Sequence, residues 1–342
     1  MVKCEVKKNM SAKDLHIHGV IILPILSDYK RWSERIWTAI DEFPEYKLKG
    51  RSVQRVLGGF GAFGNPSSFH HPTIRALRTE LKSRVRPFFK SYAPDGSRLE
   101  MLMDRICVRH RDFGTVSGES WHRDVYDGPK PLHESDEVFG GWVNLSENTQ
   151  ELVVLLGTHN DPLYDTTGFA TQVGDGQLTE RLAAQANQSF GCIKTNKKGH
   201  VEVPPGHAVI FLQHILHAVL GGKKQPNVEE LRLFCGYRLT RDTESLIDYD
   251  TINMSVPMIP SGQLPPMYSQ NHYMFFNKYQ KFREWGEKTF HPQCLFERVT
   301  KDGQKYYTPG GKTRTLPSLK DMGFHLPPYT SEDLETLRPE LL

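Results

Sequence analysis

The segment SWHRDVYD, residues 120–127, contains a histidine and an aspartate two positions apart, His122 and Asp124. In a strand or at its frayed end, residues i and i+2 point the same way, so these side chains can converge on one ion. A neutral imidazole and a carboxylate form a mixed nitrogen and oxygen site that suits Fe(II). Because a His-x-Asp pair alone is common, a metal site needs a further ligand from elsewhere in the chain.

Residues 204–239 offer that ligand, in a pattern that reads as strand, turn, strand, turn and strand. His217 ends an apolar stretch, and we favour it as the distal ligand. His207 and His214 are the alternatives. His207 follows a PPG turn and is expected to be exposed, whereas His214, an odd number of residues from His217, would face the other way in a regular strand.

The turn residues GGKKQPN follow, and the next strand then carries an arginine, Arg232. If the two strands pair antiparallel about residues 224 and 225, Arg232 lies opposite His217. A guanidinium is a natural bidentate partner for the distal carboxylate of 2-oxoglutarate, so Arg232 is our candidate clamp. Arg238, on the same strand face but further along, is the alternative clamp, and a solvated strand-edge charge is the alternative interpretation of Arg232.

Three further residues are weaker candidates for contact with such a cosubstrate. Arg109 lies on the strand before the iron motif, where a solvated strand face explains it equally well. Asn144 and Thr149 are candidates for the pocket wall, with hydrogen-bonded sheet or turn positions as the alternative.

Composition narrows the class of protein. With 342 residues the chain is long enough for a substantial core, and its formal net charge of +3 makes no case for nucleic acid or a membrane surface. No apolar run approaches the length of a membrane helix, and the polar N-terminus does not resemble a secretory signal. Five widely spaced cysteines indicate reduced thiols. We therefore expect a cytoplasmic protein, with the nucleus as the alternative.

Periodicity predicts which elements position the candidate residues. A short β-prone run at 19–25 precedes a helix after Ser27, and a second helix is predicted from Pro72 to about Phe89. The glycine-rich segment 57–68 between them lacks a P-loop lysine and is predicted to be a loop. A third helix is expected over Asn277–Phe290. Strands are predicted at Glu100–His110, Val138–Leu145, Glu151–Leu156, Ala208–Leu212, Ile215–Leu220 and Leu231–Leu239.

Helices in front and short strands behind predict an α+β chain around a sandwich, jelly-roll or barrel core. We divide it into an N-terminal strand and helices at 1–97, a core at 98–245, and a C-terminal extension at 246–342. The extension is expected to cover the active site or mediate self-association, giving a monomer or a homodimer; simple packing on the core is the alternative.

Four segments, in order over about residues 15–240, resemble the phytanoyl-CoA dioxygenase family of Fe(II)/2-oxoglutarate-dependent oxygenases. GVIILPILSDYKRW resembles that family's N-terminal strand and helix start, and SWHRD its iron motif. GGWVNLSENTQELVVLLGTHND and PPGHAVIFLQHILHAV resemble its later segments, the second of which ends in the distal histidine. Arg232 falls where the family places its 2-oxoglutarate arginine, although the preceding turn is longer here.

The resemblance implies a double-stranded β-helix core, also called a jelly-roll or cupin-like core, with Fe(II) held by His122, Asp124 and His217. It implies 2-oxoglutarate and O2 as cosubstrates, with ascorbate as a stimulant. The expected reaction is hydroxylation of an unactivated C–H bond in a small-molecule or lipid-like substrate, with release of succinate and CO2. Related halogenases lack the carboxylate, so Asp124 favours hydroxylation.

Two other classes remain open from the sequence. A jelly-roll binding module without activity would have lost a ligand or the clamp, and neither loss is visible. A zinc hydrolase could use the same two histidines and aspartate, but it would need a nearby general base and no arginine clamp.

Overall fold

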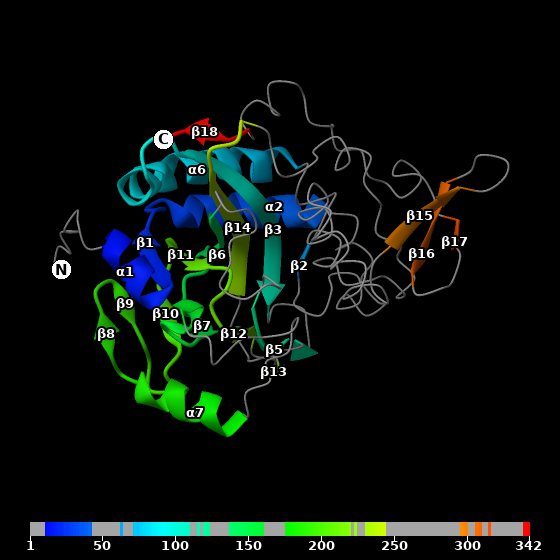
Figure 1. Cartoon of the computed structure of the whole chain (residues 1–342). Coiled ribbons are helices and arrows are strands. Elements are labelled where there is room, and N and C mark those ends of the chain that lie inside the picture. The colour runs from blue at the N-terminus through cyan, green and yellow to red at the C-terminus, as the bar shows by residue number, and fades with distance from the viewer. Residues whose placement is uncertain are drawn as a thin grey trace.

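The protein is described by a computed structural model that combines helices with antiparallel sheets (Figure 1). It describes residues 11–42, 62–63, 71–109, 115–116, 119–123, 137–160, 175–219, 222–223, 230–243, 295–299, 305–309, 314–315 and 338–342. The described helices are α1 (Ser11–His18), α2 (Tyr29–Glu42), α6 (Pro72–Tyr92), α7 (Asp175–Ala184) and the 3-10 helix η1 (Thr158–Asn160). None of them is both long and apolar enough to pass through a membrane.

The larger sheet is antiparallel throughout and contains seven strands among the described residues. Its order is β1-β11-β6-β14-β3-β18, and β2 also pairs with β3. These strands are β1 (Val20–Pro24), β2 (Ala62–Phe63), β3 (Arg98–Arg109), β6 (Glu137–Asn144), β11 (His207–Leu212), β14 (Glu230–Thr240) and β18 (Glu340–Leu341).

The smaller sheet that concerns the site has four described strands in the order β10-β7-β12-β5. They are β5 (Glu119–His122), β7 (Gln150–Val154), β10 (Val201–Val203) and β12 (His217–Val219). Short pairs and a three-stranded sheet complete the described strands: β4 (Thr115–Val116) with β13 (Gly222–Lys223), β8 (Ser189–Phe190) with β9 (Ile193–Lys194), and β15 (Leu295–Val299) with β16 (Lys305–Pro309) and β17 (Arg314–Thr315).

Alternation along the strands separates the two faces of the larger sheet. In β14 the odd-numbered residues from Leu231 to Leu239 belong to the core that packs under α2 and α6. The even-numbered residues, including Arg232, therefore point to the opposite face. That face packs on the four-stranded sheet through a second core of Trp142, Val209, Phe211, Val154, Val201 and their neighbours. The two sheets thus enclose an interior lined on one side by β14 and β6 and on the other by β7 and β12.

Helix α6 shows how local sequence builds the outer layer. Ile74, Leu77, Leu81 and Val85 recur at helical spacing and are all buried against the sheet. Pro72 occupies the first turn, and the Nδ1 atom of His71 accepts a hydrogen bond from the Thr73 backbone at 3.2 Å. The predicted helix at 72–89 is therefore confirmed, three residues longer than expected.

The six predicted core strands agree with observed strands to within a few residues; the strand predicted at Ile215–Leu220 begins only at His217 and is described as far as Val219. One prediction needs correction, because Ala62 and Phe63 within the glycine-rich segment pair with β3 instead of remaining a loop. The predicted helix Asn277–Phe290 lies outside the described residues. Helices α1 and α7 were not predicted, and both are short with a modest apolar face.

The end of the chain joins the larger sheet, although the sequence suggested only an extension. In β18, Leu341 pairs with Arg98 of β3, which on its other side pairs with Thr240 of β14. The side chains of Lys82 and Arg86 on α6 also donate to backbone carbonyls of the final five residues. The first predicted region likewise contributes β1 to this sheet. The division into three regions stays a prediction.

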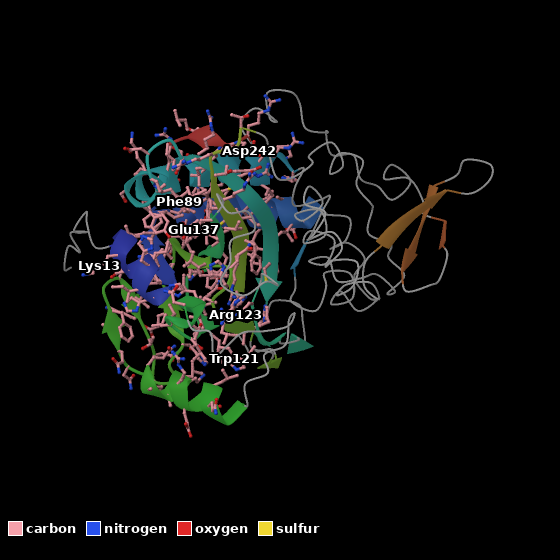
Figure 2. The ribbon with its side chains drawn as sticks, viewed as in Figure 1. Lys13, Phe89, Trp121, Arg123, Glu137 and Asp242 are labelled. Atoms are coloured by element: carbon pink, nitrogen blue, oxygen red, sulfur yellow. The ribbon has the colours of Figure 1, made fainter. Side chains whose placement is uncertain are left out.

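A half-buried carboxyl at the start of β6 makes stability depend on pH. Tyr92 donates a hydrogen bond to Glu137 at 2.5 Å, in the aromatic cluster near Phe89 (Figure 2). Burial raises the pKa of Glu137 above 4.5, against smaller lowering effects of the Tyr92 hydrogen bond and the charge of His16. A carboxyl whose pKa is raised in the folded state binds more protons there than in the unfolded state, so stability falls as pH rises through that window.

We expect Glu137→Gln to remove this loss of stability at higher pH. The amide oxygen still accepts the hydrogen bond from Tyr92, and the side chain has no ionised form whose burial would cost free energy. The difference in unfolding free energy between variant and wild type should grow in favour of the variant as pH rises above about 4.5. Urea unfolding between pH 4 and 8 measures it, with Glu80→Gln on the exposed side of α6 as the control. Parallel profiles for wild type and Glu137→Gln would contradict the prediction.

Candidate metal and carboxylate site

The two favoured histidines lie side by side on neighbouring strands. His217 of β12 is in register with His122 of β5, and their ring centroids are 4.3 Å apart. Both are buried, with exposed fractions of 6% and 2%. His217 also contacts the ring of Phe211 on the opposing sheet, at 5.0 Å between centroids. The pair therefore points into the interior between the sheets.

The ring orientation of His217 suits a metal ligand. Its Nδ1 atom lies 3.1 Å from the carbonyl oxygen of Ile215. Because a carbonyl can only accept, Nδ1 is the protonated nitrogen in this contact, and the Nε2 atom of the neutral ring keeps its lone pair. Metal-bound histidines in proteins are usually oriented in this way by a partner on the other nitrogen.

The strand that carries His217 is fixed by the turn after β7. The Thr158 hydroxyl accepts a hydrogen bond from the Leu216 backbone at 3.0 Å and donates to the Leu155 carbonyl at 2.7 Å. Trp121 packs against a small buried cluster that contains Leu155 and Leu216. This position gives Trp121 a packing role, and the turn that contains Thr158 supports the site.

Arg123, next to His122, ties β5 to the same region (Figure 2). Its exposed fraction is 1%, and its guanidinium donates to the backbone carbonyl of His214. This contact holds the end of β5 against the turn that precedes His217. Arg123 was not among the residues selected from the sequence.

The competing histidines occupy other environments. His214 lies in the turn before β12, where burial first, and then the nearby His159 and Arg123, lower its pKa to about 4. His207 begins β11, is half-buried, and its Nδ1 atom contacts the Pro205 carbonyl. His159 contacts the backbone of His16 at 2.9 Å through Nε2. The histidine that lies beside His122 is His217.

The third predicted ligand, Asp124, lies outside the described residues. Within the described part of the chain, no group of three or more His, Cys, Asp or Glu side chains could hold a metal ion. The described portion of the site is therefore a pair of histidines, and Asp124 follows His122 at the spacing of i and i+2. Two buried imidazoles that face each other across neighbouring strands fit a metal such as Fe(II).

The predicted hairpin between the strands of His217 and Arg232 is wrong. β12 pairs with β5 and β7, whereas β14 pairs with β3 and β6, so the two strands belong to different sheets. Arg232 is in register with Asn144 and Cys107, not with His217. The two side chains instead face the same interior from opposite sheets.

Strand β7 runs from the position of the histidines to the position of Arg232. Val154 at one end is in register with His217, and Gln150 at the other end accepts a hydrogen bond from Nε of Arg232. Val154 lies four residues further along the strand than Gln150, or about 13 Å at about 3.3 Å per residue. The histidines and Arg232 therefore lie about one short strand apart along the interior.

The guanidinium of Arg232 is held on three sides. Its exposed fraction is 9%, and its Cζ atom lies 4.2 Å from the centroid of the Trp142 ring. Nη2 donates to Glu230 at 3.1 Å, in addition to the hydrogen bond from Nε to Gln150. The interpretation of Arg232 as a solvated strand-edge charge does not fit this burial.

Asn144 belongs to the network that supports this arginine. Its Nδ2 atom donates to the carbonyls of Asn148 and Val203, both at 2.8 Å. Its Oδ1 atom accepts from the Ser146 backbone at 2.8 Å and from Gln150 at 2.7 Å. All of its hydrogen-bonding capacity is used within the protein, which matches the alternative we gave for Asn144.

The remaining candidates are less informative. Thr149 is exposed, immediately before β7. Arg109 is the last residue of β3 and is in register with Glu230 of β14. Its side chain is not among those that the structure describes. Sequence reasoning missed Gln150, Glu230 and the stacking role of Trp142. The signal available was a buried-strand pattern, Gln150, Leu152 and Val154, that begins with a polar residue on its inward face.

Arg238, the alternative clamp, is committed elsewhere. It is fully buried and donates from Nη1 to Glu100, itself fully buried, at 2.8 Å. Its Nη2 atom donates to the Thr240 hydroxyl at 3.0 Å. A guanidinium already paired with a buried carboxylate is a poor partner for an incoming one.

The chain matches no protein-family model and no curated protein. Among solved structures, it is similar to the non-heme alpha ketoglutarate dependent carbocyclase SnoK from nogalamycin biosynthesis, at 15% identity and a TM-score of 0.47 over 74% of this chain and 92% of that one. It is also similar to EctD from S. alaskensis with 2-oxoglutarate and 5-hydroxyectoine, at 15% identity and a TM-score of 0.43 over 66% and 74%. The non-heme alpha ketoglutarate dependent epimerase SnoN matches at 14% identity and a TM-score of 0.41 over 66% and 80%. These values are too low to assign a family, so the function is inferred below from the residues of this chain.

Proposed function

We propose that this chain is an Fe(II)- and 2-oxoglutarate-dependent oxygenase of the phytanoyl-CoA dioxygenase type. His122, Asp124 and His217 hold the iron, and Arg232 binds the distal carboxylate of 2-oxoglutarate. The observation that carries the proposal is the register of His122 with His217, joined through β7 to the level of Arg232. A zinc hydrolase would not require a buried arginine at that distance from the histidines.

Each of these residues has a defined task. His122 and His217 present imidazole nitrogens from the four-stranded sheet. Asp124, two residues after the end of β5, adds a carboxylate. Arg232 reaches in from the opposite sheet and fixes one end of the cosubstrate by charge-assisted hydrogen bonds. Bound iron and 2-oxoglutarate would support C–H hydroxylation by O2, in which one oxygen atom goes to the substrate and the other to succinate, with release of CO2.

The walls between the two ends of the site are apolar. Trp142 and Phe211 from the larger sheet and Val154 from the smaller sheet belong to one buried core. Such walls exclude bulk water and strengthen the electrostatic contact between Arg232 and a carboxylate. They also favour a substrate with an apolar portion, so a small-molecule or lipid-like substrate is the class we propose.

The enclosing architecture is that of a double-stranded β-helix in this proposal. Its support is the pair of antiparallel sheets packed face to face, with the histidines on one and the arginine on the other. The region from 246 onward covers the site or mediates self-association. Asn144 acts indirectly, by holding in place the Gln150 side chain that supports Arg232. Contact of Thr149 and Arg109 with the cosubstrate, and the cytoplasmic location, stay predictions.

The proposal is tested by anaerobic addition of Fe(II) and then 2-oxoglutarate to the metal-free protein. We expect the weak visible charge-transfer band of the chelate, and its loss in His122→Ala with the fold preserved. If the protein binds iron and stays folded but no band forms, the oxygenase assignment is wrong. Metal analysis of protein purified without added metal then distinguishes zinc from no metal.

A further inference from the structure

The guanidinium of Arg232 is oriented by groups that are themselves fixed. Gln150 has an exposed fraction of 1%, and its Nε2 atom donates to Asn144 Oδ1 at 2.7 Å, to Ser146 Oγ at 2.8 Å and to the Leu231 carbonyl at 3.1 Å. The Leu231 carbonyl can only accept, and Nε of Arg232 can only donate. Both ends of the Gln150 amide are thereby assigned, so Oε1 must face the arginine.

With Nε on Gln150 and one face on Trp142, only the far edge of the guanidinium is available to a ligand. This edge consists of Nη1 and Nη2, the pair that a carboxylate binds in bidentate fashion. In the described part of the chain, Nη1 has no hydrogen-bond acceptor, whereas Nη2 donates to Glu230 at 3.1 Å. An internal carboxylate therefore occupies half of the edge that an incoming carboxylate needs.

Glu230 can hold this position because of its place in the sheet. It lies two residues before Arg232 in β14, so both side chains point to the same face. Its side chain is 20% exposed, compared with 11% for that of Arg232. Glu230 thus lies toward the outside of the arginine, where it can turn away when a ligand arrives from within.

We infer that Glu230 is an internal competitor for the carboxylate-binding edge of Arg232, and that it sets the selectivity of the site for its cosubstrate. The inference rests on the proposed function. A ligand that is anchored at the metal stays bound even while Glu230 holds Arg232, so the competition costs it only part of its affinity. A dicarboxylate without a chelating group lacks that anchor and competes poorly. Glu230 therefore suppresses binding of simple dicarboxylates more than that of 2-oxoglutarate.

The test uses the full-length protein loaded with Mn(II) in place of iron, so that no oxygen chemistry intervenes. Calorimetric titration with 2-oxoglutarate and with glutarate gives the dissociation constants of wild type, Glu230→Gln, Arg232→Ala and the double variant. We expect Glu230→Gln to bind glutarate about tenfold more tightly, and 2-oxoglutarate about threefold more tightly, than wild type. In the Arg232→Ala background the same change should give no gain, because nothing remains to compete for.

A variant damaged in its fold would lose affinity, so a gain cannot come from a structural defect. The matched control is Glu147→Gln, which removes an equal charge from an exposed side chain paired with Lys30. Unchanged affinities in Glu230→Gln, or an equal gain in the Arg232→Ala background or in Glu147→Gln, would overturn the inference. Failure of the proposed function gives a different result: wild type then binds 2-oxoglutarate no better than Arg232→Ala does.

Discussion

His217→Ala should reduce iron-dependent conversion of 2-oxoglutarate to succinate by more than about 100-fold, because in the proposed function it removes a ligand of the metal. The same loss is expected for His122→Ala, which faces it across the strand pair at 4.3 Å between ring centroids. Succinate can be measured without a known substrate, because such enzymes turn over slowly when uncoupled. Equilibrium dialysis of Fe(II) in the same samples should show weaker binding, a readout independent of turnover.

The matched control is His207→Ala. That histidine is half-buried, contacts only a local carbonyl through Nδ1, and was the alternative ligand in the sequence. We expect its succinate formation and iron binding to remain within about twofold of wild type. If His207→Ala loses iron while His217→Ala keeps it, the distal ligand is misassigned.

The local content of the fold could be predicted because each element is specified by nearby residues. The apolar runs of β6, β11 and β14 are bounded by turn residues. Helix α6 is indicated by Pro72 in its first turn and by buried apolar residues that recur at helical spacing. The helices and strands that were missed are short. β18 is two residues long and forms only because β3 offers an unpaired edge, a property that no local pattern contains.

Partner choice between strands is where the sequence failed. Two strands joined by a turn-rich segment such as GGKKQPN usually pair with each other, and this expectation placed Arg232 opposite His217. In the structure β12 instead joins β5 and β7, and β14 joins β3 and β6. The pairing is decided by long-range packing of both sheets around one core, which alternation within a strand cannot reveal.

The two histidines and the arginine chosen for the chemistry of their side chains point into one interior, although the predicted pairing between their strands was wrong. Their role in binding a metal and a carboxylate stays a prediction. Gln150 was overlooked because a glutamine at a strand end has many ordinary uses. Its importance lies in being buried beside Arg232 with an assigned amide orientation, and that depends on Asn144, Ser146 and the Leu231 backbone together.

Glu100→Ala should lower the free energy of unfolding by about 3–5 kcal/mol, which is the largest effect on stability that we expect from a single substitution. Glu100 and Arg238 are both 0% exposed and their charged groups are 2.8 Å apart. The substitution leaves the guanidinium buried beside the Thr240 hydroxyl, at 3.0 Å, and the more distant Asp242 carboxylate, at 3.6 Å. An uncompensated buried charge costs far more than the ion pair contributes over an apolar pair.

Urea unfolding of three variants separates these effects. Glu80→Ala breaks an exposed pair with Arg84 on α6, and we expect it to cost less than about 0.5 kcal/mol. The double variant Glu100→Leu with Arg238→Met replaces both charges by apolar groups, and we expect it to recover most of the stability lost in Glu100→Ala. Equal losses for Glu100→Ala and the double variant would mean that the pair is needed for its geometry between β3 and β14. Recovery would mean that the loss in Glu100→Ala comes from the guanidinium left buried without its Glu100 partner, and not from the missing side-chain packing.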